Sequence, residues 1–235
     1  SILEATDTSQ LLALIVAEQV LRDASNGQFE TMDRSRISCI LGVTSAQELL
    51  GTMVSRLQMD EIERRKLILE GIHLLHLPLF AIRRMGKPVI ASIKGAAAGF
   101  GVGLVAACDL AIAADDAFFT LAYCHIGASP DGGSSYFLGR TLGMKHQMEL
   151  ALLGDRFGTE RAKDLGIINW SVPKEELDKE THNLATRLAN GPTKAYANSK
   201  ILFNNTHHLS MESQLQMEAE KMADSMLTDD HAEYT

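Results

Sequence analysis

The sequence predicts an α/β domain followed by a helical segment, and three observations support this. Residues 88–93 form a short apolar run that opens on a proline, as expected for a strand buried on both faces. A turn of small residues and further strand and helix patterns follow as far as residue 172. Beyond residue 173 the patterns are all helical. We therefore expect a core domain at residues 1–190 and a C-terminal helical segment at residues 191–235.

The composition fits one sizeable core and excludes several classes of protein. The chain has 235 residues, of which 46% are hydrophobic, which is enough for a single domain. Its net charge of −8 and the lack of a basic stripe argue against nucleic-acid binding. Cys39, Cys108 and Cys124 are odd in number and lack C-x-x-C spacing, so we expect neither a disulfide framework nor a metal site.

No apolar run reaches the length of a membrane span, and Ser1 does not open a signal-peptide pattern. We expect a soluble intracellular protein, in the cytoplasm or, in a eukaryotic cell, in the mitochondrion or peroxisome. An organelle presequence could already have been removed.

The first 80 residues contain patterns of unequal clarity. Residues 11–21 fit either a buried helix or a strand, and residues 35–43 fit a short strand. Ser45 and Glu48 have capping-box spacing for a helix through about residue 57. Asp60 and Glu63 begin a second helix, which we expect to end near Pro78.

The middle of the chain alternates between strands and turns. After the strand at 88–93, residues 95–103 form a glycine-rich turn and residues 104–108 a helix. Residues 109–114 then form a strand and residues 120–126 a second extended segment. The loop 127–133 places Asp131 at the start of a helix that runs through Gly139.

The last third is mainly helical. We expect a helix at 144–153, a helix capped by Thr159 and ended by Gly166, and a short strand at 167–172. Pro173 and Pro192 each open a further helix. A final helix at 210–227 carries a stripe that we assign to the core or to a subunit contact, formed by Met211, Leu215, Met222 and Met226.

The glycine-rich turn has the features of an anion-binding device. Unpaired N–H groups at the start of a helix attract a phosphate or an oxyanion, and small residues let the ligand approach. Gly99 and Gly101 supply the first two glycines of a dinucleotide fingerprint, but Leu104 occupies the third position. Asp115 and Asp116 keep this nucleotide-binding alternative open. The other alternative is tight packing with no ligand.

Three stretches resemble the enoyl-CoA hydratase/isomerase (crotonase) family. They read KPVIASIKG…GFGVGL…CDLAIAADDA, FFTLAYCHIGASPDGGSSYFLGRTLG and LALLGDRFGTERAKDLGIINWSVP. The resemblance implies a crotonase (ClpP-like) fold of repeated β-β-α units, an acyl-CoA substrate, and no metal or redox cofactor, coenzyme A being part of the substrate. It also implies C-terminal helices that cover the site and help to form a homotrimer or a dimer of trimers.

The resemblance further implies an oxyanion hole made of two backbone N–H groups. The second of these comes from Phe100. Family members supply the first from a C/S-A-G-x-D turn that is not recognisable here. If LGVTSAQELLG is its counterpart, Thr44 lies near the donor position.

The family's hydratases use two glutamates, whose positions are occupied here by Gly103 and Tyr123. Asp131 in the S-P-D-G loop matches instead the carboxylate of the isomerase branches, which moves one proton between two carbons. The alternative for Asp131 is an ordinary turn or N-cap residue. The residues that we assign to substrate binding are Ala97, Gly99, Gly101, Tyr123, His125 and Ser129.

These observations favour an enoyl-CoA isomerase with Asp131 as acid and base and the Phe100 N–H in the oxyanion hole. The alternatives are a hydratase with a different water-activating arrangement and a non-catalytic acyl-CoA-binding member of the family. A nucleotide-binding Rossmann protein is the most distant alternative.

Overall fold

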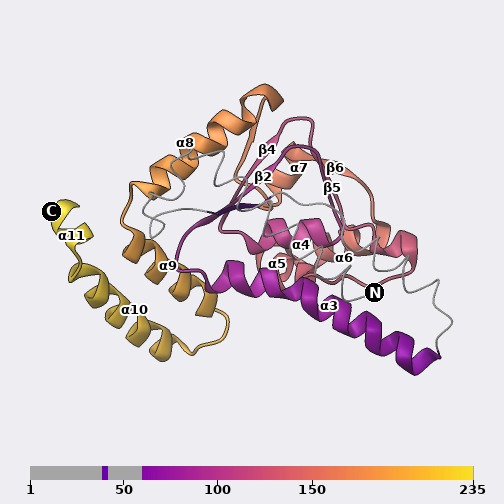
Figure 1. The fold of residues 1–235 in the computed structure, drawn as a ribbon, viewed down its shortest axis with the longest axis horizontal. Helices are drawn as coiled ribbons and strands as arrows, with labels where there is room; N and C mark the ends of the chain where they lie inside the picture. Colours follow the sequence, from indigo (N-terminus) through magenta and orange to yellow (C-terminus); the bar gives the residue numbers. More distant parts are fainter. Residues whose placement is uncertain (1–38, 42–59, 235) are drawn as a thin grey trace.

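The computed structural model describes residues 39–41 and 60–234, and two sheets lie at its centre (Figure 1). The described strands of the first sheet are parallel and run in the order β1-β2-β4-β7. They are β1 (Cys39–Leu41), β2 (Val89–Ile93), β4 (Leu110–Ala114) and β7 (Trp170–Val172). In the second sheet, β3 (Ala96–Ala98) pairs in parallel with β5 (Phe118–Thr120), and β5 pairs antiparallel with β6 (Phe157–Gly158).

Twice in the described residues, the chain passes through both sheets before a helical stretch. β2 in the first sheet leads through Lys94 and Gly95 into β3 in the second, and α4 follows. β4 and β5 repeat this path before the next helical turn. This is the β-β-α unit that the resemblance implies, so the expected fold class is confirmed.

Helices surround the sheets and extend from them at the C-terminal end, where α10 and α11 lie to one side (Figure 1). The described α-helices are α3 (Glu61–Arg84), α4 (Phe100–Ala107), α5 (Ser134–Thr141), α6 (Met144–Leu153), α7 (Thr159–Asp164), α8 (Leu177–Ala189), α9 (Thr193–Asn205), α10 (Met211–Met226) and α11 (Asp229–Tyr234). In the part of the chain that the structure describes, two 3₁₀ helices connect them to the strands, namely η2 (Tyr123–Ile126) and η3 (Lys174–Glu176).

The core lies between the sheets and the helices that pack on them. Residues 111–114 of β4 are buried throughout, which fits a central parallel strand covered on both faces. Phe119 of β5 is fully buried and its ring stacks on Phe157 of β6 with 5.7 Å between centroids. A second cluster joins α3, α4 and α5 through Leu79, Leu104 and Phe137, so α4 is packed from two sides.

Helix α3 begins as expected but does not end near Pro78. The Asp60 side chain accepts the Glu63 N–H at 2.8 Å, which confirms the N-cap. The helix then continues past Pro78 to Arg84. Proline weakens a helix interior, but here the following turn buries Leu79 and Ile82 in the core, and that packing outweighs the lost hydrogen bond.

Three boundaries around the turn and the Asp131 loop also differ from expectation. α4 begins at Phe100 and not at residue 104, because Gly99 adopts φ 51° and turns the chain directly into the helix. Residues 123–126 form η2 and not a strand, because Ala122 is left-handed and ends the extended path. α5 begins after Gly133, so Asp131 precedes the helix and does not cap it.

The later elements form where expected, but the expected end residues are wrong by one position at Thr159, Gly166, Pro173 and Pro192; the C-cap of α7 is Leu165 and not Gly166. The strand expected at 167–172 shortens to β7, Thr159 is the first residue of α7 and Gly158 its cap. Pro173 and Pro192 precede η3 and α9 as cap residues. The expected strand at 35–43 contains β1, whereas the segments at 11–21 and 45–57 and Thr44 lie outside the described residues.

α10 forms as expected, with its Met/Leu stripe open to solvent. The side chains of this stripe are exposed by 54–70% in the single chain, namely Met211, Leu215, Met222 and Met226. The stripe is therefore not part of the chain's own core. Within the described residues, no helix combines the length and the apolar character that a membrane crossing requires.

A buried ion pair fastens the C-terminal helices to the first sheet. Lys200 Nζ of α9 donates to Asp109 Oδ2 at 2.6 Å and to the Lys87 carbonyl at 3.2 Å. The same carboxylate oxygen accepts the Val89 N–H at 2.8 Å. The two charged side chains are only 7% and 20% exposed. Removal of one partner would leave a poorly solvated charge behind.

We expect Lys200→Met to lower the free energy of unfolding by about 3 kcal/mol, because it strands the Asp109 carboxylate. The matched control is Lys94→Met, which breaks the exposed Lys94–Asp178 pair at 3.2 Å and should cost less than about 1 kcal/mol. Urea unfolding followed by circular dichroism measures both. Equal urea midpoints for the two variants would contradict the conclusion that the Lys200–Asp109 ion pair stabilises the fold.

Candidate active site

The glycine turn presents two backbone N–H groups at the start of α4. Gly99 N–H donates to the Thr120 carbonyl at 2.9 Å, which ties the turn to β5. Val102 N–H donates to the Gly99 carbonyl at 3.0 Å. The N–H groups of Phe100 and Gly101 therefore precede the hydrogen-bonded part of the helix, where the positive end of its dipole lies. Phe100 is thus the first residue of α4, as the expected oxyanion donor requires.

The Asp131 loop packs directly on this first turn of α4. A Cβ atom on Gly103 would lie 2.3 Å from the Gly132 carbonyl oxygen. A Cβ atom on Gly132, which has φ 59°, would lie 2.4 Å from Cδ2 of Phe100. Glycine is therefore required on both sides of the contact. The contact brings Asp131 next to the segment that carries the Phe100 N–H.

Asp131 is held by hydrogen bonds to its side chain and to its backbone. The Tyr123 hydroxyl donates to Asp131 Oδ1 at 2.7 Å. The Ser134 hydroxyl and N–H donate to the Asp131 carbonyl at 2.7 and 3.0 Å. The carboxylate is half-buried, and its loop is anchored at η2 and at the start of α5.

Tyr123 is deeply buried, with only 3% of its surface exposed. Burial raises the pKa of its hydroxyl well above the ordinary value, and the hydrogen bond to Asp131 and the charge of that residue raise it further. The hydroxyl is therefore a proton donor to Asp131 throughout the working pH range. The sequence placed Tyr123 near the substrate but did not indicate this partner, since the two residues lie eight positions apart in the chain.

The other residues assigned to substrate binding lie in different surroundings. Ala97 is buried in β3, and Gly99 and Gly101 flank Phe100 in the turn. His125 is exposed, and its Nε2 lies 3.1 Å from the Gly154 carbonyl. Ser129 is exposed in the loop. The structure thus brings the turn, Tyr123 and Asp131 together and directs His125 towards Gly154.

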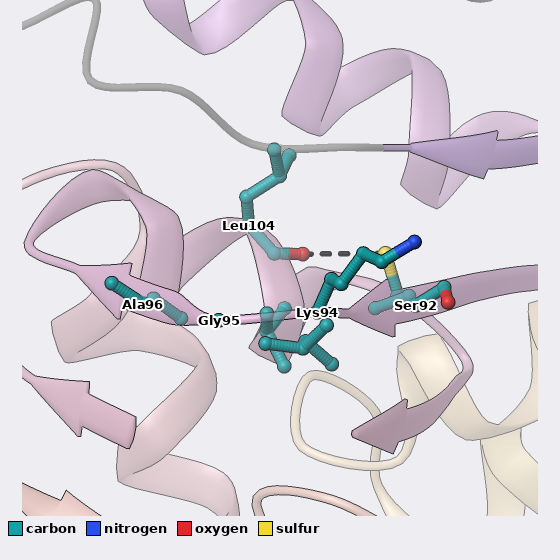
Figure 2. Close-up of a pocket in the computed structure, with 10 residues that line it drawn as sticks. Ser92, Lys94, Gly95, Ala96 and Leu104 are labelled. Atoms are coloured by element: carbon teal, nitrogen blue, oxygen red, sulfur yellow. Dashed lines mark hydrogen bonds between the residues drawn. The ribbon is translucent and has the colours of Figure 1, made fainter. Parts of the chain in front are cut away.

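A cavity of about 260 Å³ lies beside the same turn, between the end of β2, the start of β3 and α4. Figure 2 shows Ser92, Lys94 and Leu104 on its walls. Ala97 lines it as well, so one residue assigned to binding from the sequence reaches the cavity. Leu104, Val105 and Cys108 face it from the side of α4 that is roughly opposite Gly103.

Taken together, the fold and the site define an enzyme-like centre with amide donors at a helix start and a carboxylate fixed beside them. Such a centre can stabilise negative charge on a carbonyl oxygen while the carboxylate moves a proton. Comparison with known proteins identifies the family. The family model "Enoyl-CoA hydratase/isomerase" matches residues 74–233, and the chain belongs to this family.

This chain matches curated relatives whose names give different activities, and each match covers about half of the relative's length. A "Probable enoyl-CoA hydratase" of Rhodobacter capsulatus is 38% identical over 60% of this chain and 55% of its own. The trans-2-decenoyl-[acyl-carrier-protein] isomerase of Streptococcus mutans is 35% identical over 50% and 44%. The 1,2-epoxyphenylacetyl-CoA isomerase of Escherichia coli is 35% identical over 58% and 52%. The chain therefore spans about half the length of these relatives.

Solved structures show the same architecture. An enoyl-CoA hydratase from Polaromonas sp. JS666 superimposes with a TM-score of 0.71 at 32% identity, over 78% of this chain and 70% of that one. An enoyl-CoA hydratase from Bacillus anthracis gives a TM-score of 0.68 at 26% identity, over 74% and 66%. The crotonase fold expected from the sequence is thus supported independently of the local motifs.

We expect Gly103→Ala to destabilise the protein by about 1–3 kcal/mol, because the new methyl group overlaps the Gly132 backbone and forces the Asp131 loop away from α4. Gly86→Ala is the matched control, since its Cβ would make only an ordinary 3.6 Å contact with Ala197. Thermal unfolding of both variants measures the difference. A Gly103→Ala protein as stable as the control would show that the loop is not packed as described.

Proposed function

We propose that the chain is an acyl-CoA isomerase that shifts a carbon–carbon double bond next to a thioester. The observation that carries the proposal is the Asp131 carboxylate, fixed by Tyr123 in a loop that packs on the first turn of α4, where Phe100 lies. The family supports a coenzyme A thioester as the substrate. The cavity beside the turn supports a place for part of that substrate.

The reaction needs one base and one stabilised oxyanion. Asp131 takes a proton from C2 of a 3-enoyl thioester, and the electrons of that C–H bond move into an enolate whose oxygen accepts the Phe100 N–H. Protonated Asp131 then returns the proton to C4, and the double bond moves from C3–C4 to C2–C3. Proton and electron counts balance without an external oxidant or reductant. Asp131 ends in its starting state.

The two positions that hold glutamates in the family's hydratases support isomerisation over hydration. Gly103 has no space for any side chain, because the Gly132 backbone lies where its Cβ would be. Tyr123 donates to Asp131 and carries no carboxylate. Neither position can activate a water molecule as a carboxylate would.

A hydratase remains the second candidate, because the relative in Rhodobacter capsulatus carries a hydratase name at 38% identity. A non-catalytic acyl-CoA-binding protein is the third, since the first oxyanion donor expected near Thr44 lies outside the described residues. A trimeric assembly also stays a prediction, which the exposed Met/Leu stripe of α10 supports.

Asp131→Asn tests the proposed base. We expect it to lower the rate of double-bond migration by about 10²–10⁴-fold, since the amide cannot accept the proton. The measurement is mass spectrometry of 3-enoyl-, 2-enoyl- and saturated acyl-CoA after incubation with purified protein in D₂O. Asp164→Asn is the control, because Asp164 is an exposed carboxylate on α7. Water addition to the 2-enoyl thioester would favour the hydratase, and thioester binding without turnover the non-catalytic protein.

Phe100→Pro tests the backbone donor. Phe100 is the first residue of α4, a position where proline is well tolerated, and the substitution removes the N–H together with the aromatic ring. We expect a rate loss of about 10²–10³-fold. Phe100→Leu loses the same aromatic ring but keeps the N–H, so the difference between the two variants reports the hydrogen bond. Equal rates for both would contradict the placement of the oxyanion at this amide.

A further inference from the structure

Two arginines lie together where α3, α5 and the connection between α9 and α10 meet. The Arg140 guanidinium of α5 covers the Tyr136 ring, with 3.4 Å from its central carbon to the ring centroid. The Arg83 guanidinium near the end of α3 covers the neighbouring Phe137 ring at 5.3 Å. The two rings meet edge to face with 5.1 Å between their centroids. The pair of rings therefore holds both guanidinium groups on one small patch of the surface.

The Arg140 guanidinium is held in place by further contacts. Its Nη1 donates to the Tyr136 carbonyl at 2.8 Å, and its Nη2 lies 3.5 Å from His208 Nε2. The Tyr136 hydroxyl lies 2.8 Å from the same His208 nitrogen. His208 comes from the connection at residues 206–210, so that connection closes a third side of the patch.

Arg83 is fixed through its backbone. The Asn204 side chain of α9 donates to the Arg83 carbonyl at 3.1 Å, which joins α9 to the end of α3. The Arg83 side chain is half-buried, whereas Arg140 is exposed. The first guanidinium thus lies deeper in the patch and the second lies at its surface.

The positive charge of the patch is not balanced by the part of the chain that the structure describes. There, neither guanidinium forms an ion pair with a carboxylate. The charge of Asp109 reaches Arg83, but that carboxylate is already paired with Lys200 at 2.6 Å.

The two guanidinium groups also repel each other. Burial lowers the pKa of the Arg83 guanidinium, and the charge of Arg140 lowers it further, against the opposite effect of Asp109. Two like charges are thus held near each other in a chain whose net charge is −8. An anion bound to both groups would remove this repulsion.

We propose that Arg83 and Arg140 form a binding site for a phosphate group, carried by inorganic phosphate or by a small phosphate monoester. A guanidinium is a planar fork of N–H donors that matches phosphate oxygens two at a time. A phosphate dianion balances both positive charges, whereas a carboxylate balances one. This site is separate from the proposed reaction, because it requires neither the Asp131 carboxylate nor the Phe100 amide.

Isothermal titration calorimetry with sodium phosphate, in a zwitterionic buffer at constant ionic strength, tests the site. We expect saturable binding to the unchanged protein. Arg83→Gln and Arg140→Gln should each lower the affinity by about 10- to 100-fold, the equivalent of one hydrogen bond to a charged group. Arg140→Lys keeps the charge without the fork, so its affinity should fall less than that of Arg140→Gln.

Arg156→Gln is the matched control. Its guanidinium also covers an aromatic ring, that of Phe118 at 4.7 Å, but it lies after α6 and away from Arg83 and Arg140. We expect the phosphate affinity of this variant to equal that of the unchanged protein. Circular dichroism and thermal unfolding check that each variant is folded. Arg140 is exposed, so its variants keep the test decisive if Arg83→Gln does not fold.

Two further titrants identify the source of the phosphate group. Tighter binding of inorganic phosphate than of glycerol 3-phosphate would support the free ion, and the reverse order would support a phosphate monoester. Acetate should bind at least about tenfold more weakly than either, because it carries one charge and two oxygens.

Three results would overturn the inference. They are the absence of saturable phosphate binding, an unchanged affinity in both Arg83→Gln and Arg140→Gln, and an equal loss of affinity in Arg156→Gln. Acetate binding as tight as that of phosphate would overturn the assignment of a phosphate group. Each readout is binding, so failure of the isomerase proposal would leave the result of this test in place.

Discussion

The site depends on one close backbone contact, between Gly103 on α4 and the carbonyl of Gly132 in the loop before α5. With only 2.3 Å between the place of a Cβ on Gly103 and that oxygen, the two segments approach as closely as glycine permits. Phe100 covers Gly132 from the same helix turn. The start of α4 and the loop that carries Asp131 are therefore held in a fixed relative position, which preorganised charge stabilisation requires.

Gly103 and Tyr123, which the family resemblance aligns with the glutamates of the hydratases, both contact the Asp131 loop. Gly103 provides the space in which the loop sits, and Tyr123 provides the hydrogen bond that orients Asp131. Both positions thus hold the loop that carries Asp131. Under the proposed function, a change at either one would act on the reaction through Asp131.

Contacts with distant parts of the chain hold α4 and the Asp131 loop in place. α3 and α5 bury their side chains against α4 through Leu79 and Phe137. The Lys200–Asp109 pair fastens α9 to the end of the α4–β4 connection, 91 residues away in sequence. Hydrophobic packing and one poorly solvated ion pair thus fix the scaffold on which the loop is seated. The cavity lies on the other side of α4, so that helix separates the cavity from the Asp131 loop.

The sequence alone determined the strand before the glycine turn and the N-cap at Asp60, because each depends on local spacing and residue type. The catalytic roles of Phe100 and Asp131, which the family resemblance implies, stay predictions. Only the tertiary structure decided that α3 continues past Pro78, that residues 123–126 coil into η2, and that Tyr123 holds Asp131. These features arise from burial and from contacts between segments, and periodicity along the chain carries no information about which side chains meet across a loop.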